Sequence, residues 1–398
     1  MVSLYAENSL ENFWKLVTPF GEDIWREAVM LAIQSLDIPC QDHDQVLNWS
    51  LGESNYGHSN WRLSVPKQLY YCLKPMIPQF VSKHLRRILC AGKQNHYKDH
   101  LFWPIDNRLM NYLWMVLTMA MDLTGKQELQ MIGFWPDHKK TAFVLTHDVE
   151  TEFGQSHVEE IAQVDASYGF HSAFFFVMNR YPVDMGLIRS LIDRGYEVGV
   201  HGYNHDGKLL CMRKCPVKRF FAINQFAEEI GANSFRSPMT LRDPRRMQNL
   251  GLPYDLSFFD TDPFEPMPGG TMSVFPFHMG KLLELPYTLA QDYTILELLK
   301  ETNSNIWKQK VKYLQSVNGM MLLDTHPDYL KLGNNLDVYR EFLDGMQMQT
   351  RDLFCALPSE VGAWWQERTA MIGGNISGRA SITRIIKDNQ TQTLSFIL

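Results

Sequence analysis

The sequence has few cysteines and no excess of positive charge. Only 6 of its 398 residues are Cys, and its 38 Lys and Arg residues are outnumbered by 44 Asp and Glu residues, which gives a net charge of −6. Without a basic field, nothing in the chain attracts phosphate groups over a distance. Nucleic acid is therefore not expected as a partner.

Long hydrophobic runs are also absent. No stretch reaches the roughly 20 apolar residues that cross a bilayer, and residues 1–7 lack the basic and apolar segments of a secretory signal. We therefore expect a cytoplasmic protein without a membrane span, in which the six Cys are free thiols. Cys211 and Cys215 are four residues apart, but a zinc knuckle needs a second such pair.

The chain does contain enough apolar sequence for a large core. Hydrophobic residues make up 45% and charged residues 21%, the proportions of an ordinary globular protein. The length predicts two or three structural units. We place them at 1–135, which is mostly helical, at 136–355, where strands and helices alternate, and at 356–398, a helix followed by a small β appendage.

The alternation in the central region predicts a parallel sheet or a barrel. Apolar runs typical of buried strands lie at 142–145, 173–177, 196–200, 282–285 and 320–323. Helical periodicity covers 157–167, 184–194, 218–229, 294–300, 306–316 and 336–347. Outside this region we expect two helices within 1–37, one at 106–123, one beginning at 359, and strands at 381–386 and 393–397.

Two of the predicted strands end in residues that can carry chemistry. The first leads directly into Asp148 and Glu150, which point to the same side of an extended backbone because they are two residues apart. About fifty residues later, another strand leads into His201 and His205. Parallel α/β folds present their catalytic groups at such carboxyl ends.

His201, His205 and Glu150 form a plausible set of metal ligands. The two histidines are spaced i, i+4, so one helical turn would place both rings on one face. Two His and one carboxylate leave a coordination position open, which is typical of a catalytic rather than a structural zinc site. The alternative is a pair of exposed histidines in a loop.

Asp148, Arg236 and His326 are candidates for acid–base chemistry. Asp148 could act as a general base if a cation such as Arg236 keeps its carboxylate ionised and oriented. His326 follows another strand and could protonate a leaving group. Each residue also has a structural interpretation, as a helix cap, a surface cation and a turn histidine. We interpret His147 as structural.

The combination of motifs is more specific than any one of them. It resembles the polysaccharide deacetylase family, which is carbohydrate esterase family 4 or the NodB-homology domain, over about residues 140–329. The matching motifs, in the family's order, are Thr146-His147-Asp148-Val149-Glu150, His201-Gly202-Tyr203-Asn204-His205, Arg236-Ser237-Pro238, Tyr254-Asp255-Leu256-Ser257 and Leu323-Asp324-Thr325-His326.

The resemblance implies a fold, a reaction and a set of roles. The fold is a distorted seven-stranded (β/α) barrel, here with a helical N-terminal lead-in and the C-terminal β appendage. The reaction is hydrolysis of an N- or O-acetyl group on a sugar or glycan intermediate, in which a metal-bound water attacks the acetyl carbonyl. Asp148 would be the base, oriented by Arg236, and His326 the acid, supported by Asp255.

The resemblance also implies the binding residues. Glu150, His201 and His205 would bind zinc or another divalent transition metal. The residues implied on the substrate side are Tyr203, Pro238 and Leu323. The sequence departs from the family's usual opening, because Val149 follows Asp148 and Glu150 takes the ligand position, and Met239 replaces a Gly that often follows Arg-x-Pro. Two alternatives stay open: a metal-independent amidohydrolase of the same fold acting on a small C–N substrate, and a non-catalytic glycan-binding barrel.

Overall fold

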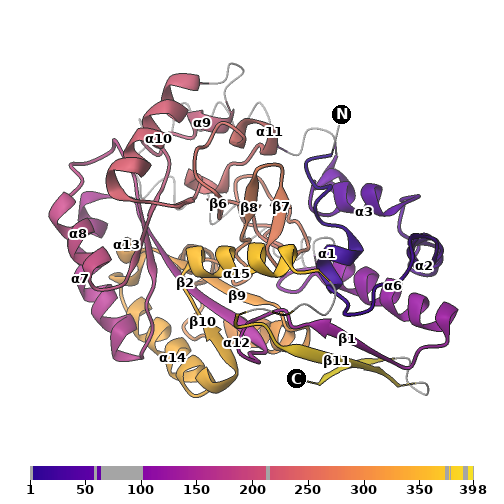
Figure 1. Cartoon of the computed structure of the whole chain (residues 1–398). Helices are drawn as coiled ribbons and strands as arrows, with labels where there is room; N and C mark the ends of the chain where they lie inside the picture. Colours follow the sequence, from indigo (N-terminus) through magenta and orange to yellow (C-terminus); the bar gives the residue numbers. More distant parts are fainter. Residues whose placement is uncertain are drawn as a thin grey trace.

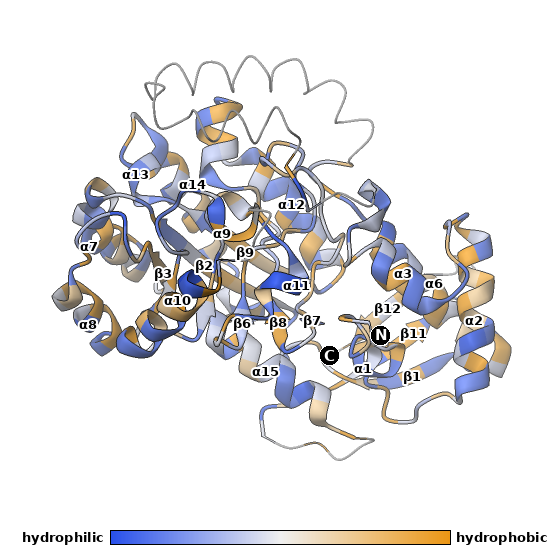
Figure 2. Ribbon diagram, turned by 90° about the horizontal axis from the view of Figure 1, so that it is seen from above, coloured by the Kyte–Doolittle hydropathy of each residue, from blue (hydrophilic) through white to orange (hydrophobic). Residues whose placement is uncertain are grey.

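The computed structural model describes residues 3–57, 61–63, 102–211, 216–372, 376, 378–388 and 393–397. A curled, mainly parallel sheet lies at its centre, and helices surround the sheet (Figure 1). In Figure 2 these helices carry both hydrophobic and hydrophilic residues along their length, as amphipathic helices do when one side packs on a sheet. None of the described helices has the length and apolarity that a bilayer crossing requires.

Seven parallel strands form the barrel. They are β2 (Thr141–Val149), β3 (Ala173–Phe176), β4 (Glu197–Val200), β5 (Ser234–Phe235), β6 (Tyr254–Asp255), β8 (Leu282–Glu284) and β9 (Met320–Thr325). Each strand from β2 to β8 pairs with the next in this order, and β9 pairs with β2. The circuit closes beyond β8, where Leu289 bridges Leu323 in parallel and the N–H groups of Thr288 and Leu289 both donate to the Leu322 carbonyl at 3.1 Å.

The prediction of a distorted seven-stranded barrel is therefore confirmed. The distortion has two visible sources: β5 and β6 are only two residues long, and a single bridge joins the continuation of β8 to β9. All nine residues of β2 and all four of β3 are buried, as expected for strands that are covered on both faces. Two further strands extend the sheet, β7 (Phe277–Met279) antiparallel to β8 and β10 (Leu353–Cys355) parallel to the start of β2.

Helices connect and cover the strands, and the longer ones lie close to where the sequence predicts them. They are α7 (Glu152–Ser167), α8 (Met185–Asp193), α9 (Lys208–Cys211), α10 (Val217–Ile230), η3 (Pro238–Thr240), α11 (Pro244–Met247), the π-helix η4 (Tyr293–Leu298), α12 (Asn305–Ser316), α13 (Pro327–Leu330), α14 (Asn335–Gln347), η5 (Thr350–Asp352) and α15 (Pro358–Ala370). α7 begins five residues before its predicted start because the Thr151 side chain caps it by accepting from the Gly154 N–H.

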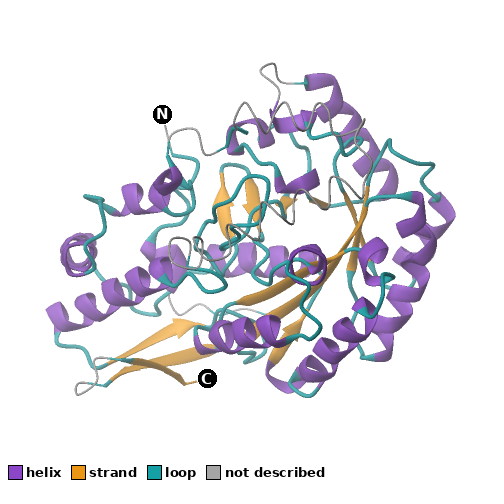
Figure 3. Ribbon diagram, turned by 180° about the vertical axis from the view of Figure 1, so that it is seen from behind, coloured by secondary structure: helices purple, strands orange, loops and turns teal. Residues whose placement is uncertain are grey.

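In the described part of residues 1–135, helices are the main elements, and there is also one strand. These elements are α1 (Leu10–Trp14), α2 (Glu22–Ser35), α3 (His43–Trp49), η1 (Ser54–Tyr56), α6 (Arg108–Thr124) and β1 (Glu128–Ile132). β1 pairs antiparallel with β11 (Ile382–Lys387), which pairs with β12 (Leu394–Ile397). This three-stranded sheet extends to the side of the barrel (Figure 3). The N-terminal region and the C-terminal appendage thus share one sheet.

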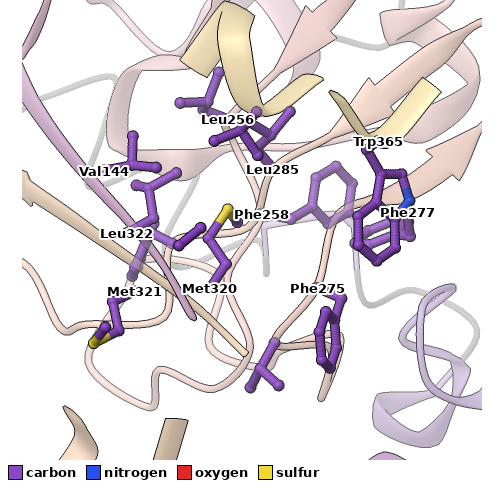
Figure 4. Close-up of a cluster of buried hydrophobic side chains, with 14 of the residues drawn as sticks. Val144, Leu256, Phe258, Phe275, Phe277, Leu285, Met320, Met321, Leu322 and Trp365 are labelled. Carbon is purple, nitrogen blue, oxygen red and sulfur yellow. The ribbon is translucent and has the colours of Figure 1, made fainter. Parts of the chain in front are cut away.

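The hydrophobic core runs continuously from the barrel into the flanking regions. Figure 4 shows Met320, Met321 and Leu322 of β9 in the same buried cluster as Phe275 and as Trp365 of α15. Next to it, the buried Arg368 guanidinium donates to the carbonyls of four residues, Asn12, Phe13, Ile132 and Gly133. Burial lowers its pKa to about 9. Arg368 therefore ties α15 to α1 and β1.

Two of the expected free thiols are seen, at Cys40 and Cys355. Cys72, Cys90 and Cys215 lie outside the described residues, so the spacing of Cys211 and Cys215 is not tested.

Candidate active site

The carboxyl edge of the barrel brings most of the predicted site residues together. Asp148 is the last but one residue of β2, and Glu150 follows that strand. His201 follows β4, Arg236 follows β5, and His326 follows β9. All these strands run in one direction, so their ends meet at the same edge. Asp148, His201, Arg236 and His326 are almost completely buried.

Glu150, His201 and His205, which we call the metal triad, converge on one point. The Oε1 atom of Glu150 lies 2.8 Å from His205 Nε2 and 4.0 Å from His201 Nε2. The ligand atoms of all three side chains lie within 4.8 Å of one another. Ligands on a tetrahedral zinc at about 2.0–2.1 Å from the ion are separated by roughly 3.3 Å. The two distances from Glu150 Oε1, 2.8 and 4.0 Å, lie on either side of this ligand-to-ligand distance.

The chemistry of the metal triad also fits a cation. Both ring nitrogens of His201 and the Nε2 of His205 are buried and make no hydrogen bond of good geometry. Buried polar nitrogens are rarely left without a partner. These nitrogens therefore favour a bound cation that accepts their lone pairs. Burial lowers the pKa of His201 to about 4, which keeps the imidazole neutral. Burial also opposes ionisation of Glu150, but His205, His326 and His201 hold its pKa well below the usual range.

The two histidines do not lie on a helix, so the predicted helical turn is wrong. Residues 201–207 form an irregular loop, which we call the histidine loop, with left-handed backbone at Gly202, His205 and Gly207. The loop places the two imidazole centroids 5.2 Å apart. The two rings therefore lie close together, as the i, i+4 spacing predicted, but on an irregular loop and not on a helical turn.

Asp148 shares a buried arginine with a second carboxylate. The Nη1 of Arg236 donates to Asp148 Oδ1 at 3.1 Å and to Asp324 Oδ1 at 2.5 Å. Burial alone would raise the pKa of Asp148, but His201, Arg236 and His326 outweigh it and hold that pKa below its usual value. Burial holds the pKa of Asp324 well above its usual value, in spite of Arg236. Of the two carboxyl groups, Asp148 is therefore the one that ionises more readily, and Asp324 the one that holds a proton more readily.

His326 is supported by Asp292, not by Asp255. Asp292 Oδ1 lies 2.7 Å from His326 Nδ1, and Asp292 Oδ2 accepts the backbone N–H of His326 at 2.8 Å. Burial opposes the charged imidazole, but Asp292 outweighs it and holds the pKa of His326 well above its ordinary value. Nε2 of His326 is directed to the metal triad and lies 3.7 Å from Glu150 Oε1. Sequence reasoning missed Asp292, although it follows a strand that ends at this edge.

The predicted support of His326 by Asp255 is wrong because Asp255 belongs to a different buried pair. It accepts a hydrogen bond from Ser257 Oγ at 2.7 Å and is hydrogen-bonded to Glu284 at the end of β8. Glu284 Oε1 accepts the Phe258 N–H at 3.0 Å. Burial and the neighbouring Asp255 hold the pKa of Glu284 well above its usual value.

This acid pair predicts that Glu284→Gln stabilises the protein at neutral and higher pH. Above the ordinary Glu pKa of about 4.3, the unfolded chain releases a proton that folded Glu284 keeps, so the wild type loses up to about 1.4 kcal/mol of unfolding free energy per pH unit. The amide of the variant cannot ionise, yet it can accept from Phe258 and donate to Asp255. We expect the variant's advantage in urea denaturation to grow between pH 5 and pH 8. If Glu284→Gln and the wild type show the same pH dependence of stability, this prediction is wrong. Glu11→Gln, which changes an exposed glutamate, serves as the control.

Two of the three residues implied on the substrate side lie beside the metal triad. Tyr203 and Pro238 line the same small pocket as His205, together with Ser237 and Leu241. Tyr203 also lies under the guanidinium of Arg219, which is 5.0 Å from its ring centroid. These side chains therefore form a wall next to a metal ligand.

The third residue, Leu323, does not face the site, so that prediction is wrong. In the register of β2 with β9, Thr146 pairs with Asp324 and His147 with Thr325. Side chains alternate along a strand, so Leu323 shares the outer face with Thr325, and Asp324 faces the interior with Thr146. Thr146 Oγ1 lies 3.3 Å from Asp324 Oδ1. The inner position next to His326 is thus occupied by a carboxyl group.

His147 lies on the outer face of β2, away from the metal triad. Its Nδ1 lies 2.7 Å from Thr325 Oγ1 and its Nε2 2.8 Å from Asp165 Oδ2. Asp165 also accepts from Ser172 and Tyr339. The ring links β2, β9 and α7 within the core, which agrees with a structural interpretation.

Comparisons with known proteins find similar structures but no similar sequences. No family model and no curated protein matches the chain. A Mycobacterium smegmatis protein that carries the name polysaccharide deacetylase is 18% identical with a TM-score of 0.47, over 61% of this chain and 96% of its own. Puue allantoinase is 14% identical with a TM-score of 0.47, over 58% of this chain and 92% of its own. The Bc1960 peptidoglycan N-acetylglucosamine deacetylase is 13% identical with a TM-score of 0.37, over 58% of this chain and 90% of its own. Similarity at this level does not decide a function, which we infer from the side chains themselves.

Proposed function

We propose that this chain is a metal-dependent hydrolase of the polysaccharide deacetylase family, which removes an N- or O-acetyl group from a sugar or glycan intermediate. The observation that carries the proposal is the convergence of Glu150, His201 and His205, in which both buried ring nitrogens of His201 make no hydrogen bond, beside Asp148 and His326. Glu150, His201 and His205 would hold zinc or another divalent transition metal. A cation bound there would polarise the acetyl carbonyl and lower the pKa of a coordinated water.

Asp148 would remove a proton from the attacking water. Its Oδ1 is engaged by Arg236, and its Oδ2 lies 3.4 Å from His201 Nδ1, at the border of the metal triad. Arg236 is fully buried, donates to the Leu256 carbonyl at 3.0 Å, and lies over the Phe175 ring. It therefore fixes the orientation of the carboxylate as well as its charge.

His326 is placed to return a proton to the departing amine or alcohol. With Nδ1 bound to Asp292, the Nε2–H of the charged imidazole is the group directed to the metal triad. One proton is thus accepted at Asp148 and one is donated from His326 in each turnover. The Tyr203 and Pro238 wall would contact the sugar on the side of His205.

Metal content and acetate release test the proposal together. Protein purified without chelator should hold close to one zinc per chain and release acetate from an acetylated amino sugar or an acetylated glycan. His201→Ala should lose both, because it removes one of three ligands. His171→Ala, which alters an exposed histidine outside the metal triad, is the matched control and should lose neither.

Two outcomes would overturn this function. Full activity of metal-free wild type on a small C–N substrate would favour the amidohydrolase. Binding of glycans with no acetate release across a broad panel would favour the non-catalytic barrel.

A further inference from the structure

A buried glutamate of the N-terminal region binds the segments that follow β5 and β6. Glu53 follows α3, and its side chain is 1% exposed. Arg242 donates to both of its oxygens, from Nε at 2.7 Å and from Nη2 at 2.5 Å. The Gly270 N–H and the Trp61 Nε1–H also donate to it, at 2.8 and 3.1 Å. Four such donors make this carboxylate a rigid anchor.

Arg242 passes this anchoring on to a strained turn. Its Nη1 donates to the carbonyls of Thr240 and Met267 at 3.2 and 3.1 Å, and its guanidinium lies over the Phe259 ring. Met239 and Thr240 are consecutive residues with left-handed backbone, at φ 58° and 48°. Such a strained backbone persists only when its surroundings enforce it. The bond from Arg242 to the Thr240 carbonyl is one of those constraints.

The turn formed by residues 238–241 packs directly on the histidine loop. A Cβ atom on Gly202 would lie 2.5 Å from Cδ of Pro238, so the proline ring occupies the space beside that glycine. A Cβ on Gly207 would lie 2.7 Å from Met239 Cε and 3.1 Å from Leu241 Cδ1. The turn thus touches the histidine loop next to both metal-ligating histidines.

We propose that Glu53 is a positioning residue of the metal triad. Through Arg242 it holds the 238–241 turn in its strained form, and the turn holds the histidine loop with His201 and His205 aimed at Glu150. The inference rests on the proposed metal site. The N-terminal region then has a role in catalysis, because Glu53, a residue from outside the barrel, helps to hold the metal ligands in position.

The metal dissociation constant of Glu53→Gln tests this inference. Gln keeps the volume but loses the charge that holds Arg242, so we expect zinc to bind about 10-fold or more weakly in a competition titration with a chelator. Arg368→Lys is the matched control, because Arg368 also ties the N-terminal region to the rest of the chain but does not contact the 238–241 turn. It should leave the dissociation constant within about twofold, even if it lowers the melting temperature as much.

Hydrogen exchange of the metal-free protein gives a second readout. In Glu53→Gln the amides of residues 201–207 should exchange faster than in the wild type, and in Arg368→Lys they should not. Leu241→Ala, which weakens the contact with Gly207 but leaves Glu53 and Arg242 in place, should resemble Glu53→Gln in both measurements and replaces it if that variant does not fold.

The two proposals fail in different ways. Unchanged affinity and exchange in Glu53→Gln, or equal shifts in Glu53→Gln and Arg368→Lys, would overturn the positioning role of Glu53 alone. A wild type that binds no zinc would overturn the proposed function, and the exchange of residues 201–207 would then decide whether Glu53 holds the histidine loop.

Discussion

Asp148→Asn should bind zinc like the wild type and turn over acetylated substrate at least about 10²-fold more slowly. The amide keeps the shape of the side chain and can still accept from Arg236, so the fold and the metal triad should be unchanged. It cannot accept the proton that the attacking water must lose. The loss should therefore appear in kcat, with the zinc content as the internal check.

Asp324→Asn is the matched control for this variant. Both carboxyl groups bind the same Arg236 nitrogen, at 3.1 and 2.5 Å, and both are buried. The pKa of Asp324 is raised and that of Asp148 is lowered, so Asn resembles the protonated form that burial favours at Asp324 and removes the ionised form that Asp148 needs. We expect Asp324→Asn to stay within about 10-fold of the wild type. Normal turnover by Asp148→Asn would show that Asp148 is not the base.

The barrel could be predicted because its signals are local. Buried parallel strands are short apolar runs, and their helices repeat at three and four, so β2, β3, β4, β8 and β9 and the longer helices were predicted. The two-residue strands β5 and β6 were not. Closure of the barrel was predicted only through the family resemblance. In the structure it depends on residues 287–289, which carry no strand pattern of their own and reach β9 through the single bridge between Leu289 and Leu323.

Pairings between segments far apart in the sequence could not be predicted from local sequence patterns. β1 is five residues long, and its partner β11 lies about 250 residues later, so nothing near 128–132 marks it as part of a sheet. For the same reason the sequence divided the N-terminal region from the C-terminal appendage. Glu53 and Arg242 are a further example, because each is unremarkable in its own segment and only the fold joins them.

Site residues that directly follow parallel strands could be predicted from the sequence. Those whose role depends on the face to which the side chain points could not. Asp148, Glu150, His201, Arg236 and His326 meet at one edge because their strands are parallel. The choice between Leu323 and Asp324 depends on which face of β9 each one takes, and that is fixed by the register with β2. The motif order suggested one partner for His326, and the fold supplies another from the segment after β8.

Asp292→Asn should lower kcat by about 10²-fold or more, and more for substrates with poor leaving groups. Asp292 accepts the Nδ1–H of His326 and is what keeps its imidazole charged. An Asn amide at this place removes the charge that favours the imidazolium, and if its carbonyl oxygen accepts the Nδ1–H it favours the neutral tautomer in which Nε2 has no proton to give. An N-acetyl sugar, whose amine must be protonated to depart, should then react far more slowly, and an activated aryl acetate should be affected much less.

Asp255→Asn is the decisive comparison, since the family's motif order assigns to Asp255 the role that the structure gives to Asp292. Asp255 binds Ser257 and Glu284 instead of His326, so its Asn variant should keep kcat within a few fold on both kinds of substrate. Measuring both variants on the N-acetyl sugar and on the aryl acetate separates loss of the acid from general damage, which would slow both substrates equally. If Asp255→Asn shows the leaving-group dependence and Asp292→Asn does not, the partner of His326 in the working enzyme is Asp255.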